Sequence, residues 1–380
     1  MKICRSFIII TLIFLEFGCS ATKKNILQEA LASDNPKIKN VMSKPDNFEL
    51  QIIYTQIFRD KNNKVTFKDF TYHLNAGNYF YPASTVKFPI AILALEKLNT
   101  MENTSNNTKY TIEGKSDTLQ FSEEISKVFA VSDNEASTNL LEFAGFDYVN
   151  ESMAAKGLAP FKFSHRLSTS NPGDPKTKAV TLYKDDAAIA NLPAFTNKSN
   201  VALQLNNLKK GIGYLKNGEM VNEPFDFSNK NYYPLETLHN TMKRIVFPEA
   251  FKESERFKIS EKDREFILFS MQNLPKNAGY DPVKYPDGYC KFFMFGDTKE
   301  NIPSNIKIYN KVGNAYGTLI DCAYINDTEN KVEFMISATI LVNKDGIFND
   351  DNYEYDLVGL PFMGELGRQL YNKTKKNKSN

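Results

Sequence analysis

Ser84 and Lys87 are the residues of this chain whose types and spacing first suggest chemistry. A serine hydroxyl is a poor nucleophile near neutral pH until a neighbouring base, such as a lysine amine, removes its proton. Three residues span about one helical turn, so a helix that begins near Ser84 places both side chains on one face. Apolar Val86 and Ile90 after Pro82 predict such a helix. Because this pair is common by chance, it indicates catalysis only if partners occur elsewhere in the chain.

Two later motifs supply such partners. Ser132-Asp133-Asn134 follows a helix-like segment, and Lys311-Val312-Gly313 lies in a segment rich in strand-forming residues. The order Ser-x-x-Lys, Ser-Asp-Asn and Lys-x-Gly is the motif set of class A β-lactamases and penicillin-binding proteins. The chain resembles this serine β-lactamase and penicillin-binding protein superfamily, and the class A β-lactamases most closely. The resemblance runs from about residue 48 to about residue 371.

The resemblance implies a role in acyl transfer for each of these side chains. Ser84 would attack a carbonyl carbon and become an ester, and Lys87 would accept its proton. Ser132 would pass a proton to the leaving nitrogen, and the Asn134 amide would hold the amide carbonyl of the substrate. Lys311 would bring positive charge near a substrate carboxylate. Burial and the charge of Lys311 are expected to lower the pKa of Lys87, as a general base requires.

The same resemblance assigns the oxyanion hole to the backbone N–H groups of Ser84 and Asn314, with Gly313 in the substrate-binding strand. Such donors stabilise the negative charge that develops on the carbonyl oxygen during acyl transfer. No metal or other cofactor is expected, because the 3 histidines of the chain lack the spacing of metal ligands.

Three features depart from the class A pattern. The loop 165–174 keeps Arg166 and the turn at Pro172, but no glutamate or aspartate lies between them to activate a deacylating water. Val312 replaces the usual threonine or serine, whose hydroxyl binds the substrate carboxylate. An insertion at about 175–234 is expected either to wall the active-site cleft or to form a peripheral elaboration. The acyl-enzyme is therefore expected to form but to react slowly with water.

The elements that must position these motifs predict an α/β (α+β) fold. Strand-like segments occur at both ends of the chain, and helix-like segments lie between them. The resemblance implies an antiparallel sheet of about five strands, flanked by helices, with a mostly helical domain inserted. The expected strands are 48–58, 65–74, 306–311, 317–325 and 332–342. Besides the helix after Pro82, the expected helices are 121–145, interrupted at the Ser-Asp-Asn turn, 238–246, 261–274 and 357–371.

The first residues indicate export. Lys2 and Arg5 precede a short apolar run, and Gly18-Cys19-Ser20 resembles a bacterial lipoprotein cleavage site. We expect a periplasmic or outer-membrane lipoprotein of the cell envelope, with lipid on Cys19; a plain secretory signal is the alternative. The expected parts are a signal peptide (1–18), a flexible tether with a short helix around 26–31 (19–46), a hydrolase domain (47–372) and a basic tail (373–380).

Charge and cysteine content bear on the expected partners. A formal net charge of +2 over 380 residues gives no support for nucleic-acid binding. The expected substrate is a small molecule or a fragment derived from peptidoglycan, and the membrane is reached through the lipid on Cys19. Cys290 and Cys322 form either a disulfide or two separate buried thiols. The sequence does not specify the oligomeric state.

These observations predict a cell-envelope serine hydrolase that forms an acyl-enzyme on Ser84, with β-lactam binding and slow hydrolysis. A penicillin-binding-type peptidase or an esterase acting on envelope material is the enzymatic alternative. A non-catalytic binding or sensor lipoprotein that uses the same cleft is the alternative from another class. The presence of Ser84, Lys87, Ser132 and Lys311 together favours an enzyme.

Overall fold

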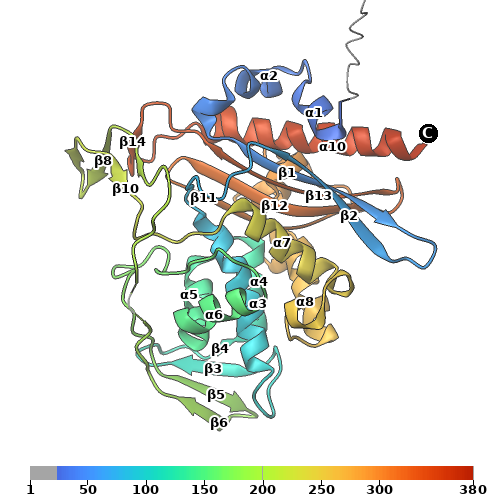
Figure 1. Cartoon of the computed structure of the whole chain (residues 1–380). Coiled ribbons are helices and arrows are strands. Elements are labelled where there is room, and N and C mark those ends of the chain that lie inside the picture. The colour runs from blue at the N-terminus through green and yellow to red at the C-terminus, as the bar shows by residue number, and fades with distance from the viewer. Residues whose placement is uncertain (1–23, 199, 380) are drawn as a thin grey trace, which may run out of the picture.

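A five-stranded antiparallel sheet forms the centre of the molecule (Figure 1). The computed structural model describes residues 24–198 and 200–379, with side chains as far as residue 376. The strand order is β11-β12-β13-β1-β2, so strands from both ends of the chain pair with each other, which confirms the predicted fold class. The strands are β1 (Gln51–Arg59), β2 (Val65–Tyr72), β11 (Ile306–Ala315), β12 (Thr318–Asp327) and β13 (Val332–Leu341).

Helices cover both faces of this sheet. On one face lies α10 (Leu360–Ser379), with α1 (Ile26–Leu31) and α2 (Pro36–Met42) beside it (Figure 1). On the other face lie α7 (Leu235–Val246) and α8 (Glu261–Gln272). Because both faces are covered, the central strands β12 and β13 carry long apolar runs, and a hydrophobic core forms on each side of the sheet.

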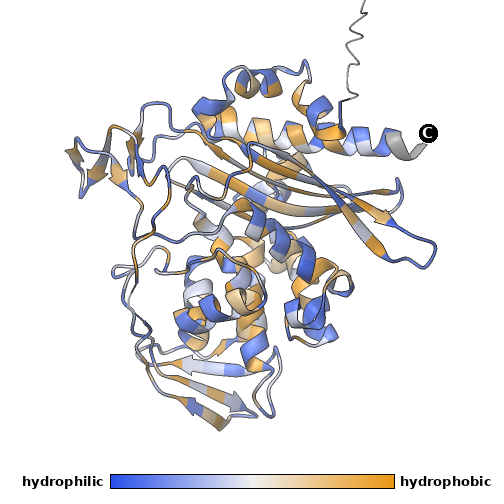
Figure 2. Cartoon of the chain, viewed as in Figure 1, coloured by the Kyte–Doolittle hydropathy of each residue, from blue (hydrophilic) through white to orange (hydrophobic). Residues whose placement is uncertain are grey.

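The helical region is built around α3 (Lys87–Leu98). Every residue of α3 except Lys97 is buried, and Figure 2 shows how strongly apolar this helix is. A helix that is apolar on all sides must lie inside the protein. The position of α3 therefore fixes the Ser84 segment, which leads directly into its first turn. The helices around it are α4 (Phe121–Ala130), α5 (Asn134–Ala144) and α6 (Phe146–Ala155).

A four-stranded sheet closes the far end of the helical region (Figure 1). Its strand order is β4-β3-β5-β6, and all its pairs are antiparallel. β5 and β6 belong to the predicted insertion, so the first part of that insertion completes this sheet. The strands are β3 (Lys109–Ile112), β4 (Leu119–Gln120), β5 (Val180–Lys184) and β6 (Ala187–Leu192).

The second part of the insertion packs against the chain that leads into Ser84. Phe227 and Tyr232 share a small apolar cluster with Tyr79, Tyr81 and Ala83. A hairpin of β8 and β9 extends away from this cluster and pairs in parallel with β14, near the C-terminal helix (Figure 1). The strands are β7 (Lys209–Lys210), β8 (Gly213–Lys216), β9 (Glu219–Val221), β10 (Phe225–Asp226) and β14 (Ile347–Phe348).

Short helical segments connect the larger elements. They are η1 (Pro45–Phe48), η2 (Ala83–Val86), η3 (Pro248–Ala250), η4 (Glu253–Glu255), η5 (Pro275–Ala278), η6 (Asp287–Cys290), α9 (Phe292–Phe295) and the π-helical turn η7 (Tyr355–Gly359). Within the described residues, no helix is both long enough and apolar enough to span a bilayer.

The predicted flexible tether over 19–46 is corrected for its described part, residues 24–46. The expected short helix is present as α1, but α2 follows it, and both pack on the folded domain. Leu27 of α1 and Ile38 of α2 are at most 2% exposed, because each helix turns its apolar side inward and its polar side chains outward. The segment is polar on average, so the helical spacing of its few apolar residues was not recognised from the sequence. Residues 1–23, including the predicted signal peptide and Cys19, lie outside the described part.

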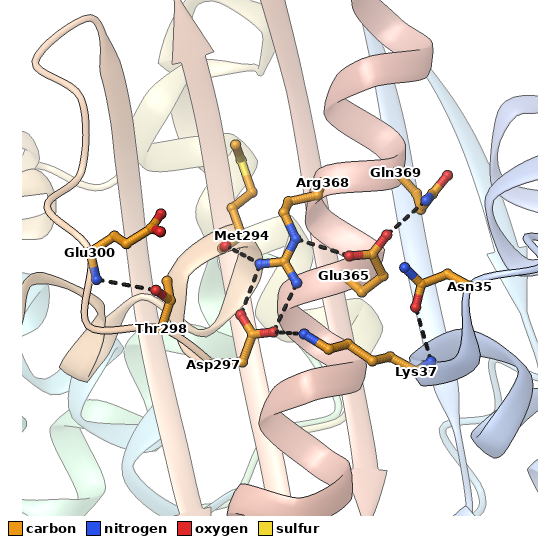
Figure 3. A network of polar contacts seen from close by, with 9 residues as sticks. All are labelled: Asn35, Lys37, Met294, Asp297, Thr298, Glu300, Glu365, Arg368 and Gln369. Carbon is orange, nitrogen blue, oxygen red and sulfur yellow. Dashed lines mark hydrogen bonds and ion pairs between the residues drawn. The ribbon is translucent and has the colours of Figure 1, made fainter.

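An ion-pair network joins α2 to α10 (Figure 3). The Asp297 side chain is 4% exposed, and its carboxylate accepts two hydrogen bonds of 2.8 Å from the Arg368 guanidinium and one of 2.7 Å from Lys37. Arg368 also donates to the Met294 carbonyl at 2.5 Å and to Glu365 at 3.0 Å. The network therefore holds three separate segments of the chain together, including the N-terminal one.

Replacing Asp297 by asparagine should lower the free energy of unfolding by about 2–3 kcal/mol, since hydrogen bonds to charged groups contribute about 1.5–3 kcal/mol. Burial alone raises the pKa of the Asp297 carboxyl, but the hydrogen bonds from Arg368 and Lys37 outweigh it and hold the pKa below its usual 3.8. The stabilisation is therefore complete above the unfolded-state pKa and is lost as the pH falls through the lower folded-state pKa.

Urea denaturation across this pH range measures the effect. Asp34→Asn is the matched control, because the Asp34–Lys39 pair lies on the surface and its loss should leave the stability unchanged. Equal stability of Asp297→Asn and the unmodified protein near neutral pH would contradict the prediction.

The predicted basic tail over 373–380 is also corrected as far as residue 379. Helix α10 continues to Ser379, and Lys373 forms a 3.5 Å ion pair with Glu29 of α1. Thr374 is buried and forms a 2.9 Å hydrogen bond with Tyr54 of β1. The part of α10 around Lys373 and Thr374 is thus anchored by α1 and the sheet.

Candidate active site

The predicted nucleophile lies in the turn that leads into α3. Ser84 is part of the 3₁₀ segment η2, and Lys87 begins α3 one turn later. In a 3₁₀ turn, residues three apart lie above one another, which keeps the two side chains on the same side. Ala83 has a φ of 46°, a left-handed conformation that is unfavourable for alanine. Such backbone strain is typical of functional turns that are held by the surrounding fold.

The Ser132 turn lies against Lys87. The Lys87 ammonium donates hydrogen bonds of 2.5 Å to the Ser132 carbonyl and to Asn134 Oδ1, and it lies 3.4 Å from Ser132 Oγ. Ser132 has a φ of 58°, and Asp133 caps α5 by accepting a 2.8 Å hydrogen bond from the Ala136 N–H. The cap and the left-handed residue together turn the Ser132 and Asn134 side chains toward Lys87.

Lys311 reaches the same hydroxyl from the central sheet. It lies in β11, is only 2% exposed, and donates 2.8 Å hydrogen bonds to Ser132 Oγ and to the Val312 carbonyl. The structure therefore brings Ser132 within reach of both predicted lysines, although Lys311 follows Lys87 by more than two hundred residues in the chain.

Gly313 allows β11 to approach the nucleophile. A Cβ atom at this position would lie 2.9 Å from the Ser84 backbone nitrogen and 3.1 Å from the Pro82 carbonyl oxygen. The first distance is shorter than real Cβ contacts and the second is tighter than most of them, so the backbone at this position favours glycine. This close approach brings the backbone of the neighbouring Asn314 alongside Ser84, where the oxyanion hole was predicted.

The two lysines have unusual electrostatics. Burial lowers the pKa of Lys87 well below its usual value of 10.5, and the charge of Lys311 lowers it further. Burial lowers the pKa of Lys311 to about 8, although Cys290 and Asp321 act in the opposite direction. Lys87 is thus the lysine whose environment favours the neutral form needed for a base.

A buried polar network supports the strand that carries Lys311. Asp321 of β12 accepts a 2.9 Å hydrogen bond from Asn310, which in turn accepts one of 2.7 Å from Lys291. Cys290 and Cys322 are both buried free thiols, so the structure supports the second of the two predicted alternatives. The rigidity behind β11 comes from hydrogen bonds rather than from a disulfide.

An open cleft of about 630 Å³ lies beside Ser84 and Asn134. The loop 165–174 forms one wall, and the end of β11 forms another. Several residues that line this cleft were not predicted from the sequence. Lys230 of the insertion, Tyr316 of the β11–β12 turn, and Tyr353 and Tyr355 of the C-terminal loop come from segments that carry no motif. Tyr81 and Ser168 lie beside predicted motifs, but neither belongs to one.

The loop 165–174 carries no carboxylate between Arg166 and Pro172, as predicted. Arg166 fixes it by donating to Glu142 at 2.8 Å and to the Asp174 carbonyl at 2.5 Å. Ser168 Oγ accepts a 2.9 Å hydrogen bond from Asn134 Nδ2, so the loop engages the amide group predicted to hold the substrate. Among the described residues that line the cleft, Asp351 is the one acidic residue, and it comes from the C-terminal loop.

Val312 does not face the cleft. It is 3% exposed and packs in the core between the sheet and α10, because successive residues of a strand point to opposite faces. The predicted loss of a hydrogen bond to the substrate carboxylate at this position is therefore wrong, because this side chain points into the core.

The comparisons with known proteins agree with this geometry. Residues 35–222, which include the first two motifs and the loop, match the sequence family described as Beta-lactamase enzyme family. A β-lactamase from Xanthomonas campestris pv. campestris is similar in structure, with a TM-score of 0.52, 11% identity, and coverage of 92% of this chain and 98% of that one. The structure of PBP-A has a TM-score of 0.50 and 13% identity, covering 93% and 96% of the two chains. A search of curated proteins found no match.

At sequence identities of 11% and 13%, the similarity to solved structures supports the fold alone. The chain has the β-lactamase and transpeptidase-like fold, and its predicted resemblance to the serine β-lactamase and penicillin-binding protein superfamily is confirmed.

Proposed function

We propose that this protein is a cell-envelope serine hydrolase, closest to the class A β-lactamases, that forms an acyl-enzyme on Ser84. The observation that carries this proposal is the position of Ser132 Oγ, 2.8 Å from Lys311 and 3.4 Å from Lys87. Ser84 and Asn134 line the open cleft beside this group of side chains. A nucleophile, a base, a proton relay and a cation are the groups that acyl transfer from an amide needs.

In the acylation step, the Ser84 hydroxyl oxygen attacks the carbonyl carbon, and neutral Lys87 accepts the hydroxyl proton. The Ser84 and Asn314 N–H groups stabilise the oxyanion. Ser132 then donates its proton to the leaving nitrogen as the C–N bond breaks, and it regains a proton from Lys87. Lys311 stabilises the serine oxygen during this transfer. The products are an ester on Ser84 and a free amine.

Release of the acyl group is slow in this proposal. Class A deacylation uses a carboxylate on the loop, and 167–173 contains none. Glu135 does not replace it, because it lies on the exposed side of α5 and pairs with Lys115 at 2.7 Å. Since general-base catalysis contributes about 10²- to 10⁴-fold, the acyl-enzyme should accumulate.

Intact-protein mass spectrometry tests the proposal. A fluorescent penicillin and a fluorophosphonate should each add one equivalent of mass to the unmodified protein, and the penicillin adduct should persist. Ser84→Ala should form neither adduct, whereas Ser116→Ala, which removes an exposed serine outside the cleft, should form both. Absence of both adducts on the unmodified protein would favour a non-catalytic binding lipoprotein, and rapid penicillin turnover would overturn slow deacylation.

The acylation rate should show a bell-shaped dependence on pH. It should rise as Lys87 loses its proton, at a pH well below 10.5, and fall above about 8 as Lys311 loses its charge. Labelling by the fluorescent penicillin, stopped at fixed times and quantified on gels between about pH 5 and about pH 10, records both the rising and the falling part of the pH profile. Lys97→Met should leave the profile unchanged, although burial also lowers the pKa of Lys97 to about 8. A rate that keeps rising above pH 8 would contradict the role of Lys311.

The envelope location is proposed from the sequence around Cys19. A lipid on this cysteine would hold the hydrolase domain near peptidoglycan, which supplies amide substrates. Metabolic labelling with an alkyne fatty acid should mark the protein, and Cys19→Ala should abolish the label. A mature protein without lipid would indicate a plain secretory signal instead.

A further inference from the structure

Lys230 is an unpaired cation in the wall of the cleft. It belongs to the insertion, is half-buried, and lines the same cleft as Ser84. Its ammonium lies 5.7 Å from the centroid of the Phe225 ring and 5.9 Å from that of Tyr316. Within the described part of the chain it forms no ion pair or side-chain hydrogen bond. By contrast, Arg166, the other cationic residue in the wall, is already paired with Glu142.

The position of Lys230 follows from its neighbours. The Tyr316 ring packs edge-on against Tyr81 with centroids 5.0 Å apart, and Tyr81 stacks on His165 at 6.2 Å. Tyr316 follows Asn314 by two residues, and Tyr81 precedes Ser84 by three. Lys230 therefore lies at the end of the cleft formed by the loop 165–174 and the end of β11.

The direction of the substrate follows from the proposed function, on which this inference rests. Ser132 protonates the leaving nitrogen, so the leaving group lies toward Ser132 and the buried Lys311. Neither of these two residues lines the open cleft. The acyl part of the substrate must extend the other way, past Asn134 and toward the wall that contains Lys230.

We propose that Lys230 binds an anionic group, such as a carboxylate, on the acyl part of the substrate. A half-buried ammonium without a counter-ion loses hydration that aromatic rings replace only in part. A carboxylate partner would restore charge-assisted hydrogen bonds, which are stronger than neutral ones. The insertion then selects substrates by the charge of their acyl group, which remains on Ser84 after the leaving group departs.

Two penicillins test this selection. Benzylpenicillin and carbenicillin share the same leaving side and differ by one carboxylate on the acyl side chain. The ratio of their acylation rate constants, carbenicillin over benzylpenicillin, should fall about ten- to a hundredfold in Lys230→Gln, the range expected for loss of a hydrogen bond to a charged group. Lys216→Gln is the matched control, because Lys216 is exposed on the same insertion and lies outside the cleft.

An unchanged ratio in Lys230→Gln would overturn the inference while leaving acylation of Ser84, and so the proposed function, intact. If neither penicillin acylates the unmodified protein, the proposed function fails, and Ser84→Ala then decides the inference by calorimetric titration with both compounds. Tighter binding of carbenicillin that depends on Lys230 supports the anion site. Equal or undetectable binding of the two compounds overturns it.

Discussion

Replacing Lys87 by methionine should lower the rate at which penicillin acylates Ser84 by at least about a hundredfold, because general-base catalysis contributes about 10²- to 10⁴-fold. Lys87 is fully buried, and its ammonium contacts both Ser132 and Asn134. Methionine has a similar length but carries no basic nitrogen, so Ser84 would keep its place and lose its proton acceptor. The rate constant for adduct formation, measured by mass spectrometry at several penicillin concentrations, records the loss.

Lys97→Met is the control for this experiment. Lys97 lies on the same helix, and its ammonium donates to the Phe143 and Ala144 carbonyls at 2.6 and 3.1 Å. Its replacement removes a comparable set of hydrogen bonds far from Ser84. The acylation rate should therefore change less than about twofold, while the free energy of unfolding falls about as much as in Lys87→Met. A Lys87→Met protein that acylates at the unmodified rate would show that another group takes the proton.

Replacing Gly313 by alanine should lower acylation by about a hundredfold or more, since removal of one oxyanion-hole donor costs about 10²- to 10³-fold. The added methyl group would lie 2.9 Å from the Ser84 nitrogen and 3.1 Å from both the Ala83 Cβ and the Pro82 carbonyl oxygen, and these atoms of the nucleophile turn cannot move aside alone. β11 must therefore shift away from Ser84 and take the Asn314 N–H with it.

Gly173→Ala provides the comparison, because a Cβ at Gly173 meets nothing within 4 Å and this glycine does not have a positive φ. It should acylate at close to the unmodified rate. Thermal melting of both variants separates a local shift from unfolding. If Gly313→Ala folds and acylates normally, the close approach of β11 is not needed for the oxyanion hole.

Much of the fold was predictable because its signals are local. The strands near both termini, the break between α4 and α5, and helix α3 follow from patterns within about ten to twenty residues. The three motifs also came from short stretches, and the structure brings Lys87, Ser132 and Lys311 together. The prediction of a flexible tether was wrong because it used the average polarity of residues 24–46. Leu27 and Ile38 form an apolar side that is buried against the core beside α10, and this surface exists only in the folded chain.

The reactive groups of the chain, their order, and the carboxylate that its loop lacks can all be read from the residues. How those groups face one another depends on the packing of segments that are distant in the chain. This packing turned Val312 into the core, favoured glycine at 313 against Ser84, and placed Lys230 of the insertion in the wall of the cleft. The reason is physical: residue type and periodicity are encoded within a segment, whereas a cleft is formed by segments that pack together only after the whole chain has folded.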